Sequence, residues 1–286
     1  MGPFKRVVKQ IRVCSPAKIN LFLHITGRRS DGYHNLQTVF QLLDWGDDMI
    51  FEPRSKTGIS IIGDTSELPE RENLIQRAAD KLKFSGNGAN IFVKKRIPTG
   101  GGLGGGSSNA ASTLLALNKL WELKIPLDKL LQISTSLGAD VPVFTAGRSA
   151  WAEGIGDKLT PLALPHRWFV IVTPKSAVKT AEIFRDPELT RNTPPITVQA
   201  FFSGAGHNDL EPLVSSRYAD VRVALDWLSS HSADVRMSGS GSSVFAAFIS
   251  EKKAKQVAKC APSTLKTLIA EGIDSRPDML VEYNTS

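Results

Sequence analysis

The chain has 286 residues, of which 41% are hydrophobic and 22% charged, and its formal net charge is +7. This length exceeds what one hydrophobic core usually organises, so we expect two packed domains, residues 1–162 and 163–286. No run approaches the roughly 18 apolar residues that span a bilayer, and residues 1–13 lack an apolar block of signal-peptide length. We therefore expect a cytoplasmic protein that makes no contact with a membrane.

The basic excess arises from 35 Lys and Arg against 28 Asp and Glu. Such an excess suits a nucleic-acid-binding protein or an enzyme whose ligands are polyphosphates. The densest cluster, residues 94–96, adjoins a glycine-rich segment, which favours the polyphosphate alternative. Nucleic-acid binding would need a continuous basic face with interleaved aromatic residues, and the other lysines are dispersed. Cys14 and Cys260 have no neighbouring residues that complete a metal cluster, so we interpret them as ordinary thiols.

The first half of the chain predicts a mixture of strands and helices. Alternating or β-branched runs indicate strands at residues 13–25, 37–43, 49–52, 59–62 and 89–97. An amphipathic pattern predicts a helix over 72–84. Two further helices are expected over 107–123 and 127–137, the second ended by Gly138.

The second half continues in the same mixed manner. Residues 168–172 predict a buried strand, and a Pro-rich stretch from 174 to about 206 predicts irregular structure that covers another part of the protein. Helices are expected at 218–230 and 251–261, with strands around Val235 and over 244–249. The pattern therefore mixes strands and helices throughout the chain, and we expect the domain boundary near residues 160–164.

Residues 98–108 contain six glycines in eleven positions between a predicted strand and a predicted helix. Glycine lets backbone N–H groups approach and converge on phosphate oxygens, and a helix N-terminus adds partial positive charge. We expect Ser107 and Ser108 to cap that helix. The segment therefore predicts a phosphate-binding loop.

Two other interpretations of the loop are weaker. A flexible linker would not join a strong strand to a strong helix with Leu103 inside it. The spacing of Gly100, Gly102 and Gly105 matches a dinucleotide fingerprint, but the acidic residue expected about 20 positions on would be Glu122, within a predicted helix. Neither a Walker lysine nor the signatures of protein kinases are present.

Three motifs in order give the chain a resemblance to a known family. They are residues 15–23 (Ser-Pro-Ala-Lys-Ile-Asn-Leu-Phe-Leu), the glycine loop, and residues 238–245 (Ser-Gly-Ser-Gly-Ser-Ser-Val-Phe). Together they resemble the galactokinase, homoserine kinase, mevalonate kinase and phosphomevalonate kinase family (GHMP kinases). The loop is two residues longer than the common Gly-Leu-Gly-Ser-Ser form. With residues 28–34 and 137–142, this longer loop is similar to one branch, which acts in the non-mevalonate route to isoprenoid precursors.

The resemblance implies an architecture and a reaction. The fold would be the two-domain α+β GHMP-kinase fold, with the active site in the cleft between an N-terminal ATP-binding domain and a C-terminal domain that closes over the acceptor. The branch implies ATP-dependent phosphorylation of the 2-hydroxyl of a cytidine diphosphate-linked methylerythritol. ATP and Mg²⁺ are the implied cofactors, and no metal ligands are predicted beyond Ser107 or Ser108 as candidates. Another GHMP kinase, with a homoserine, mevalonate or sugar acceptor, is the alternative within the family.

The resemblance also assigns roles to residues. Asp140 would be the base and Lys18 its cationic neighbour, although a capping Asp and a solvent-facing Lys are the alternatives from the residues alone. ATP would be bound by Lys95, Pro98, Thr99, Gly100, Gly101, Gly102, Leu103, Gly104, Gly105, Gly106, Ser107 and Ser108. The acceptor would meet Asn20, Tyr33, His34, Thr180 and Phe184, with aromatic rings stacking on its base. The third motif would contribute Gly239, Ser240 and Gly241.

Overall fold

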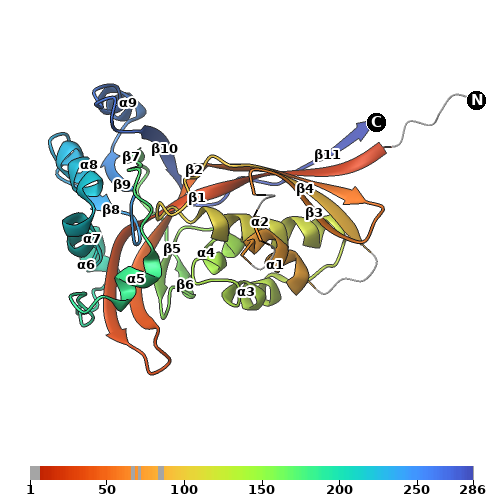
Figure 1. The fold of residues 1–286 in the computed structure, drawn as a ribbon, viewed down its shortest axis with the longest axis horizontal. Helices are drawn as coiled ribbons and strands as arrows, with labels where there is room; N and C mark the ends of the chain where they lie inside the picture. The colour runs from red at the N-terminus through yellow and green to blue at the C-terminus, as the bar shows by residue number, and fades with distance from the viewer. Residues whose placement is uncertain (1–6, 66–67, 70–71, 83–86, 286) are drawn as a thin grey trace, which may run out of the picture.

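The structure is a computed structural model that describes residues 7–65, 68–69, 72–82 and 87–285. Over these residues eleven strands join in one sheet, whose main path runs β11-β1-β2-β10-β7-β9-β8. The molecule is elongated, and the two longest strands run through both of its ends (Figure 1). No helix of the described part is long and apolar enough to cross a bilayer.

The spine of the fold is an antiparallel pair, β1 (Val7–Arg28) and β2 (His34–Arg54). Their register shifts at three places, between Pro16 and Lys18, between Asn20 and Leu23, and between Ile25 and Gly27. Such irregularities re-aim the side chains beside them. The first two flank the pair Lys18 and Asn20, which lies two residues apart on one strand face.

One end of the molecule packs helices against this pair of strands. The strands there are β3 (Gly58–Gly63), β4 (Gly88–Lys94), β5 (Ala150–Glu153) and β6 (Lys158–Pro161). The helices are α1 (Leu74–Lys81), α2 (Gly105–Leu120), α3 (Leu127–Thr135) and α4 (Val141–Ala146). Buried residues of α2, such as Leu114 and Leu117, share one core with Ile11, Leu42 and Ile91 of the strands. That core fixes α2 beneath β1 and β2.

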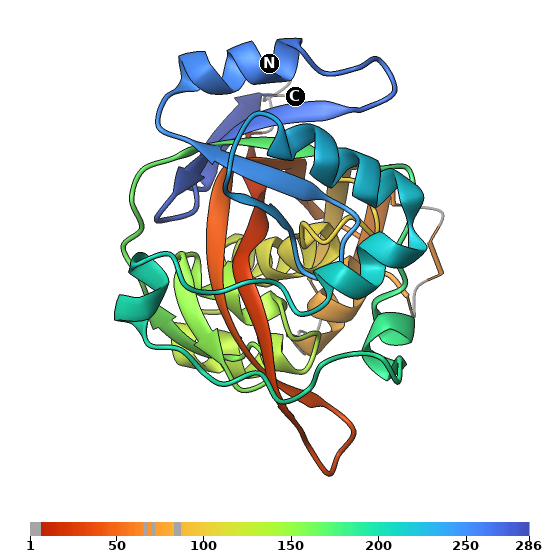
Figure 2. The same ribbon diagram turned by 90° about the vertical axis from the view of Figure 1, so that its left-hand side faces the viewer.

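The other end carries a second helix-covered part of the sheet (Figure 2). Its strands are β7 (Trp168–Val172), β8 (Val235–Met237), β9 (Val244–Phe248) and β10 (Thr267–Ile273). Its helices are α5 (Thr180–Arg185), α6 (Val198–Phe202), α7 (Glu211–Arg217), α8 (Ala219–Ser229) and α9 (Glu251–Lys259). β10 pairs with both β7 and β2, and β11 (Leu280–Thr285) pairs with β1. The chain's last strands therefore return to the first half, and the predicted division at 162/163 stays a prediction.

Most predicted elements are confirmed with ends shifted by a few residues. The predicted helix 72–84 is α1, and its predicted last residues, 83–84, lie outside the described residues. The separate strands at 37–43 and 49–52 were wrong, because β2 is continuous through both. The stretch from 174 to 206, predicted to be irregular, contains α5 and α6.

Candidate active site

The glycine loop turns by alternating its backbone conformation. Gly100, Gly102 and Gly104 have φ angles of 72°, 73° and 75°, in the left-handed region that suits glycine. A Cβ at Gly102 would overlap the carbonyl oxygen of Ser238, and one at Gly104 would lie 2.8 Å from Cζ of Phe144. The loop therefore needs glycine both for its turns and for close approach to its neighbours.

Helix α2 opens directly from this loop. Its N-cap is Gly104, which has no side chain to cap the first N–H groups, so these groups are left for a ligand. The expectation that Ser107 and Ser108 cap the helix was wrong, because both lie inside its first turns. Ser107 lines the cavity, whereas Ser108 is fully buried with its hydroxyl 2.8 Å from that of Ser15. The structure thus places Ser108 outside the cavity.

The third motif packs onto the glycine loop and onto β1. The Ser238 hydroxyl donates to the Gly102 carbonyl at 2.9 Å and accepts from the Asn20 backbone N–H at 3.2 Å. The N–H of Ser243 donates to the Gly101 carbonyl at 3.1 Å. These bonds join segments from both ends of the molecule, so the loop's position depends on all three motifs together.

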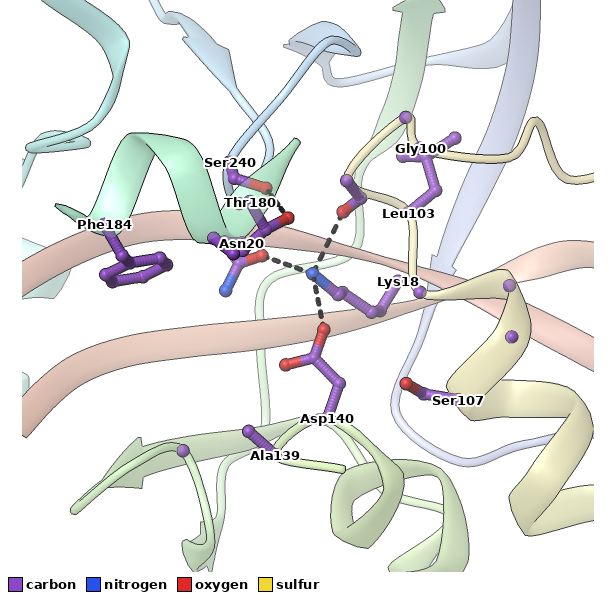
Figure 3. Close-up of a pocket in the computed structure, with 18 of the residues that line it drawn as sticks. Lys18, Asn20, Gly100, Leu103, Ser107, Ala139, Asp140, Thr180, Phe184 and Ser240 are labelled. Carbon is purple, nitrogen blue, oxygen red and sulfur yellow. Dashed lines mark hydrogen bonds and ion pairs between the residues drawn. The ribbon is translucent and has the colours of Figure 1, made fainter. Parts of the chain in front are cut away.

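Lys18 lies at the centre of the site (Figure 3), with its side chain only 3% exposed. Its Nζ donates to Asn20 Oδ1 at 2.6 Å and to the Gly102 carbonyl at 2.9 Å, and it lies 3.2 Å from Oδ2 of Asp140. A buried ammonium is costly unless an anion and hydrogen-bond acceptors compensate it. The alternative of a solvent-facing lysine is therefore excluded.

Asp140 occupies the N-cap position of α4, yet its side chain makes no capping hydrogen bond. A capping Asp would accept from the helix's own N–H groups. The carboxylate faces Lys18 instead, and its side chain is 35% exposed at the cavity wall. It is therefore free to accept a proton from a hydroxyl group held in the cavity.

Lys95 is anchored by a buried network that the sequence did not reveal. Asp47 is fully buried, pairs with Lys95, and accepts the backbone N–H groups of Arg96 at 2.7 Å and Ile97 at 2.8 Å. Asn109 of α2 accepts from Lys95 Nζ at 2.9 Å. The network holds the lysine beside the start of α2, at the glycine-lined end of the cavity.

Aromatic side chains gather at the opposite end, where α5 faces the tip of the β1–β2 hairpin. The rings of His34 and Phe184 lie 5.3 Å apart at an interplanar angle of 36°. His34 is buried, whereas Tyr33 is 61% exposed. The Thr180 and Ser240 hydroxyls are 2.6 Å apart and connect α5 to the third motif. Figure 3 shows Phe184 and Ser107 on opposite sides of the Lys18 amine.

These residues surround one cavity of about 1060 Å³. Among its lining residues are all the predicted site residues except Ser108: Lys18, Asn20, Tyr33, His34, Lys95, Pro98, Thr99, Gly100, Gly101, Gly102, Leu103, Gly104, Gly105, Gly106, Ser107, Asp140, Thr180, Phe184, Gly239, Ser240 and Gly241. Sequence reasoning missed Arg28, Thr65, Leu74, Arg185 and Arg191, which also line the cavity. Arg28 opens the segment 28–34 that carries the branch resemblance, but it was given no role. The other four stand outside any motif, and single residues of these common types carried no signal that could have found them.

A glycine-rich cradle that opens beside a lysine–carboxylate pair defines a phosphotransferase site. The comparisons with known proteins agree with it. The model of the GHMP kinase N-terminal domain matches residues 73–148, and that of the GHMP kinase C-terminal domain matches residues 198–267. The chain belongs to the GHMP kinase family, and it is a small-molecule kinase.

Two relatives cover nearly the whole chain. The 4-diphosphocytidyl-2-C-methyl-D-erythritol kinase of Nitrosospira multiformis is 50% identical over 268 residues, which cover 92% of this chain and 91% of that protein. The protein of the same name from Thiobacillus denitrificans is 48% identical over 266 residues, covering 92% of this chain and 95% of its own length.

Solved structures show the same relationship. A crystal structure of a 4-(cytidine 5'-diphospho)-2C-methyl-D-erythritol kinase matches with a TM-score of 0.79 and 35% identity, covering 91% of this chain and 98% of that one. The mevalonate kinase of Methanococcus jannaschii matches with a TM-score of 0.63 and 14% identity, covering 92% of this chain and 98% of that one. The second likeness shows the shared fold alone.

Proposed function

We propose that the chain transfers the γ-phosphoryl group of ATP to the 2-hydroxyl of 4-diphosphocytidyl-2-C-methyl-D-erythritol. The acceptor oxygen forms a bond to the γ-phosphorus while the bond to the β–γ bridging oxygen breaks, and ADP leaves with that oxygen. The proton of the acceptor hydroxyl goes to Asp140. The observation that carries the proposal is the Lys18–Asp140 pair, placed between a glycine-lined end and an aromatic end of one cavity.

The different roles of Lys18 and Asp140 follow from how deeply each side chain is buried. Phosphoryl transfer mainly requires positioned groups and neutralised charge. Lys18 is held by three acceptors, so its charge stays fixed beside the transferring group. The carboxylate of Asp140 is the group that accepts the proton.

The glycine-lined end suits the nucleotide. The open N-terminus of α2 and Lys95 supply N–H donors and positive charge for the phosphates. Among the described residues, no group of three or more His, Cys, Asp or Glu is arranged to hold a metal. Mg²⁺ fits such a site because it keeps phosphate and water ligands and needs few from the protein, with Ser107 as the candidate. When bound, the ion neutralises phosphate charge.

The aromatic end suits the acceptor's cytidine diphosphate group. Tyr33, His34 and Phe184 offer rings for a base, and Arg28 and Arg185 line the same end with positive charge that suits a diphosphate. Homoserine and mevalonate contain neither a base nor a diphosphate, so they would leave this end unfilled. The relatives at 48–50% identity are named for the cytidine-containing acceptor.

A comparison of acceptors tests the proposal. The purified protein is mixed with ATP, Mg²⁺ and one of 4-diphosphocytidyl-2-C-methyl-D-erythritol, mevalonate, homoserine or galactose, and ADP release is followed. We expect turnover with the first acceptor alone, and a new phosphomonoester signal in phosphorus NMR. Faster turnover of mevalonate, homoserine or galactose would show that this compound, and not the cytidine-containing one, is the acceptor. Inactivity with all four, together with salt-dependent retention of nucleic acid on filters, would support the nucleic-acid alternative.

A further inference from the structure

Arg191 ties together two parts of the aromatic end. It follows α5, and its guanidinium donates through Nη1 to the Leu189 carbonyl at 3.0 Å and through Nη2 to the Phe184 carbonyl at 3.1 Å. Nη2 also donates to the carbonyl of Asp186. Its Nε donates to Nε2 of His34 at 3.1 Å. The segment that carries Phe184 is therefore joined to the first residue of β2.

The contact with Arg191 decides where the proton of the His34 ring sits. An arginine Nε always carries hydrogen, so Nε2 of His34 must accept and cannot itself be protonated. The ring proton of neutral His34 therefore lies on Nδ1. Burial, and then the charges of Arg191 and Arg28, lower the pKa of His34, which keeps the ring neutral near pH 7. Among the described residues, no hydrogen-bond partner of Nδ1 is found, and the ring lines the cavity.

We propose that Arg191 is a positioning residue that fixes His34 as its Nδ1–H tautomer, so that the cavity presents an N–H donor to the acceptor's base. The inference rests on the proposed function, which supplies a cytosine base. Cytosine carries two adjacent acceptors, O2 and N3, on its pairing edge, whereas uracil has an N3–H donor there. Two donors that face each other leave both unpaired, so the fixed tautomer selects cytosine over uracil.

The first test reads the tautomer and needs no substrate. Histidine labelled with ¹⁵N gives separate NMR signals for protonated and unprotonated ring nitrogens, and the chain has five histidines. His34→Asn assigns the signals. We expect the Nδ1–H form in the unmodified protein and a shift towards Nε2–H in Arg191→Met. An Nε2–H form in the unmodified protein, or an unchanged tautomer in the variant, would overturn the inference.

The second test measures the binding of CDP and UDP by calorimetry. We expect the unmodified protein to bind CDP about tenfold or more tightly than UDP at pH 7.5, and Arg191→Met to lose most of this preference. The charged groups that act on the ring are Arg191 and Arg28. Because the charge of Arg191 lowers the pKa of His34, the ring of the variant takes up a second proton at a higher pH than the ring of the unmodified protein as pH falls below 7.5, and it then again carries Nδ1–H. The variant's CDP affinity, relative to that of the unmodified protein at the same pH, should therefore recover.

Arg217→Met is the matched control. Arg217 pairs with Asp186 and lies 3.7 Å from Glu188, so it anchors the same segment, but it donates nothing to His34. We expect this variant to keep the tautomer and the CDP preference. An equal loss of preference in Arg217→Met, or no recovery of Arg191→Met in acid, would mean that Arg191 only holds the segment and would overturn the inference. An unmodified protein that binds neither nucleotide would overturn the proposed acceptor while leaving the tautomer measurement to stand by itself.

Discussion

The ammonium of Lys18 and the carboxylate of Asp140 lie 3.2 Å apart although they come from distant parts of the chain, and they differ sharply in exposure, at 3% and 35%. Both residues line the cavity, but the ammonium of Lys18 is held by three acceptors whereas the carboxylate of Asp140 is open to the cavity. In the proposed reaction, this asymmetry makes Lys18 the fixed charge and Asp140 the group that meets the acceptor. The pair thus acts as one unit in the proposed transfer.

If Lys18 and Asp140 act as one unit, the losses of kcat caused by substituting each of them should not be additive. Lys18→Met should lower kcat, because it removes the cation that contacts the Asp140 carboxylate and offsets charge during transfer. The double variant with Asp140→Asn should be little worse than the poorer single variant. Steady-state kinetics of the three variants check this. Lys179→Met, at a lysine that is 75% exposed and paired with Glu182, should keep normal kcat. Losses that multiply cleanly would show that Lys18 and Asp140 act separately.

A side chain at Gly104 should disturb the glycine loop and weaken ATP binding. There φ is +75°, and a Cβ would lie 2.8 Å from Cζ of Phe144 and 3.2 Å from Cε of Lys18. We expect Gly104→Val to fold but to bind ATP at least tenfold more weakly, a loss of about 1.4 kcal/mol. ATP titration with circular dichroism of the same sample measures both properties.

Gly58→Val separates backbone strain from the loop's function. Gly58 has a similar φ of +86°, but nothing lies within 4 Å of its Cβ position. This control should lose some stability and keep its ATP affinity. A folded Gly104→Val protein with unchanged ATP affinity would refute the phosphate-binding role of the loop.

Loss of either aromatic ring should weaken acceptor binding by about 1–3 kcal/mol and leave ATP affinity nearly unchanged. Tyr33→Ala is the cleaner test, because the side chain is 61% exposed and its removal disturbs little packing. Phe184→Ala should also lower the melting temperature, because this ring packs against the core of the second half. Tyr33→Phe keeps the ring and should keep the acceptor KM. If Tyr33→Ala leaves that KM unaltered, the stacking assignment of Tyr33 is wrong.

The protein should lose stability in mild acid. His24 is 2% exposed, and burial, followed by the neighbouring His207, lowers its pKa. The unfolded chain takes up this proton near pH 6.5 while the folded protein does not, so the stabilisation is complete above that value and falls as pH decreases below it. His34 contributes in the same direction. Urea unfolding at pH 7.5 and about 5.5 measures the free energy of unfolding. Its decrease between the two pH values should be smaller for His24→Gln than for the unmodified protein, and equal decreases would contradict this account.

Local sequence signals were sufficient to predict the main elements and the setting of the glycine loop between a strand and a helix, because periodicity and glycine spacing are local. They failed at β2, where Asp44, Trp45, Gly46, Asp47 and Asp48 indicate a break. β2 needs a glycine at position 46, because a Cβ there would overlap the Ser15 carbonyl of the neighbouring strand. Asp47 can be buried within β2 because it pairs with Lys95. Both reasons come from distant segments, so a local pattern could not show them.

In the site, too, the features that depend on contacts between distant segments were not predicted from the residues alone. From the residues alone, Lys18 could have been a solvent-facing lysine and Asp140 a helix-capping residue. Only the family resemblance predicted that the two lie together. Arg191 had no signal at all, because a single arginine in a Pro-rich stretch gains its role from contact with His34, which lies far away in the sequence. β10 and β11 were missed because their mixed, half-buried residues show no alternation, and their partners come from the first and middle parts of the chain.

The most direct test of the central claim is the kcat of Asp140→Asn with 4-diphosphocytidyl-2-C-methyl-D-erythritol as acceptor. The amide keeps the shape of the side chain but cannot accept the hydroxyl proton as a carboxylate does. A general base contributes about 10²–10⁴-fold, so kcat should fall by that factor while ATP affinity stays nearly constant. Asp140 makes no capping bond, but it is the anion beside the buried ammonium of Lys18, so the melting temperature should fall and kcat is measured at a temperature where the variant is folded. A variant that retains full kcat would contradict the account, because transfer would then need no base at that position.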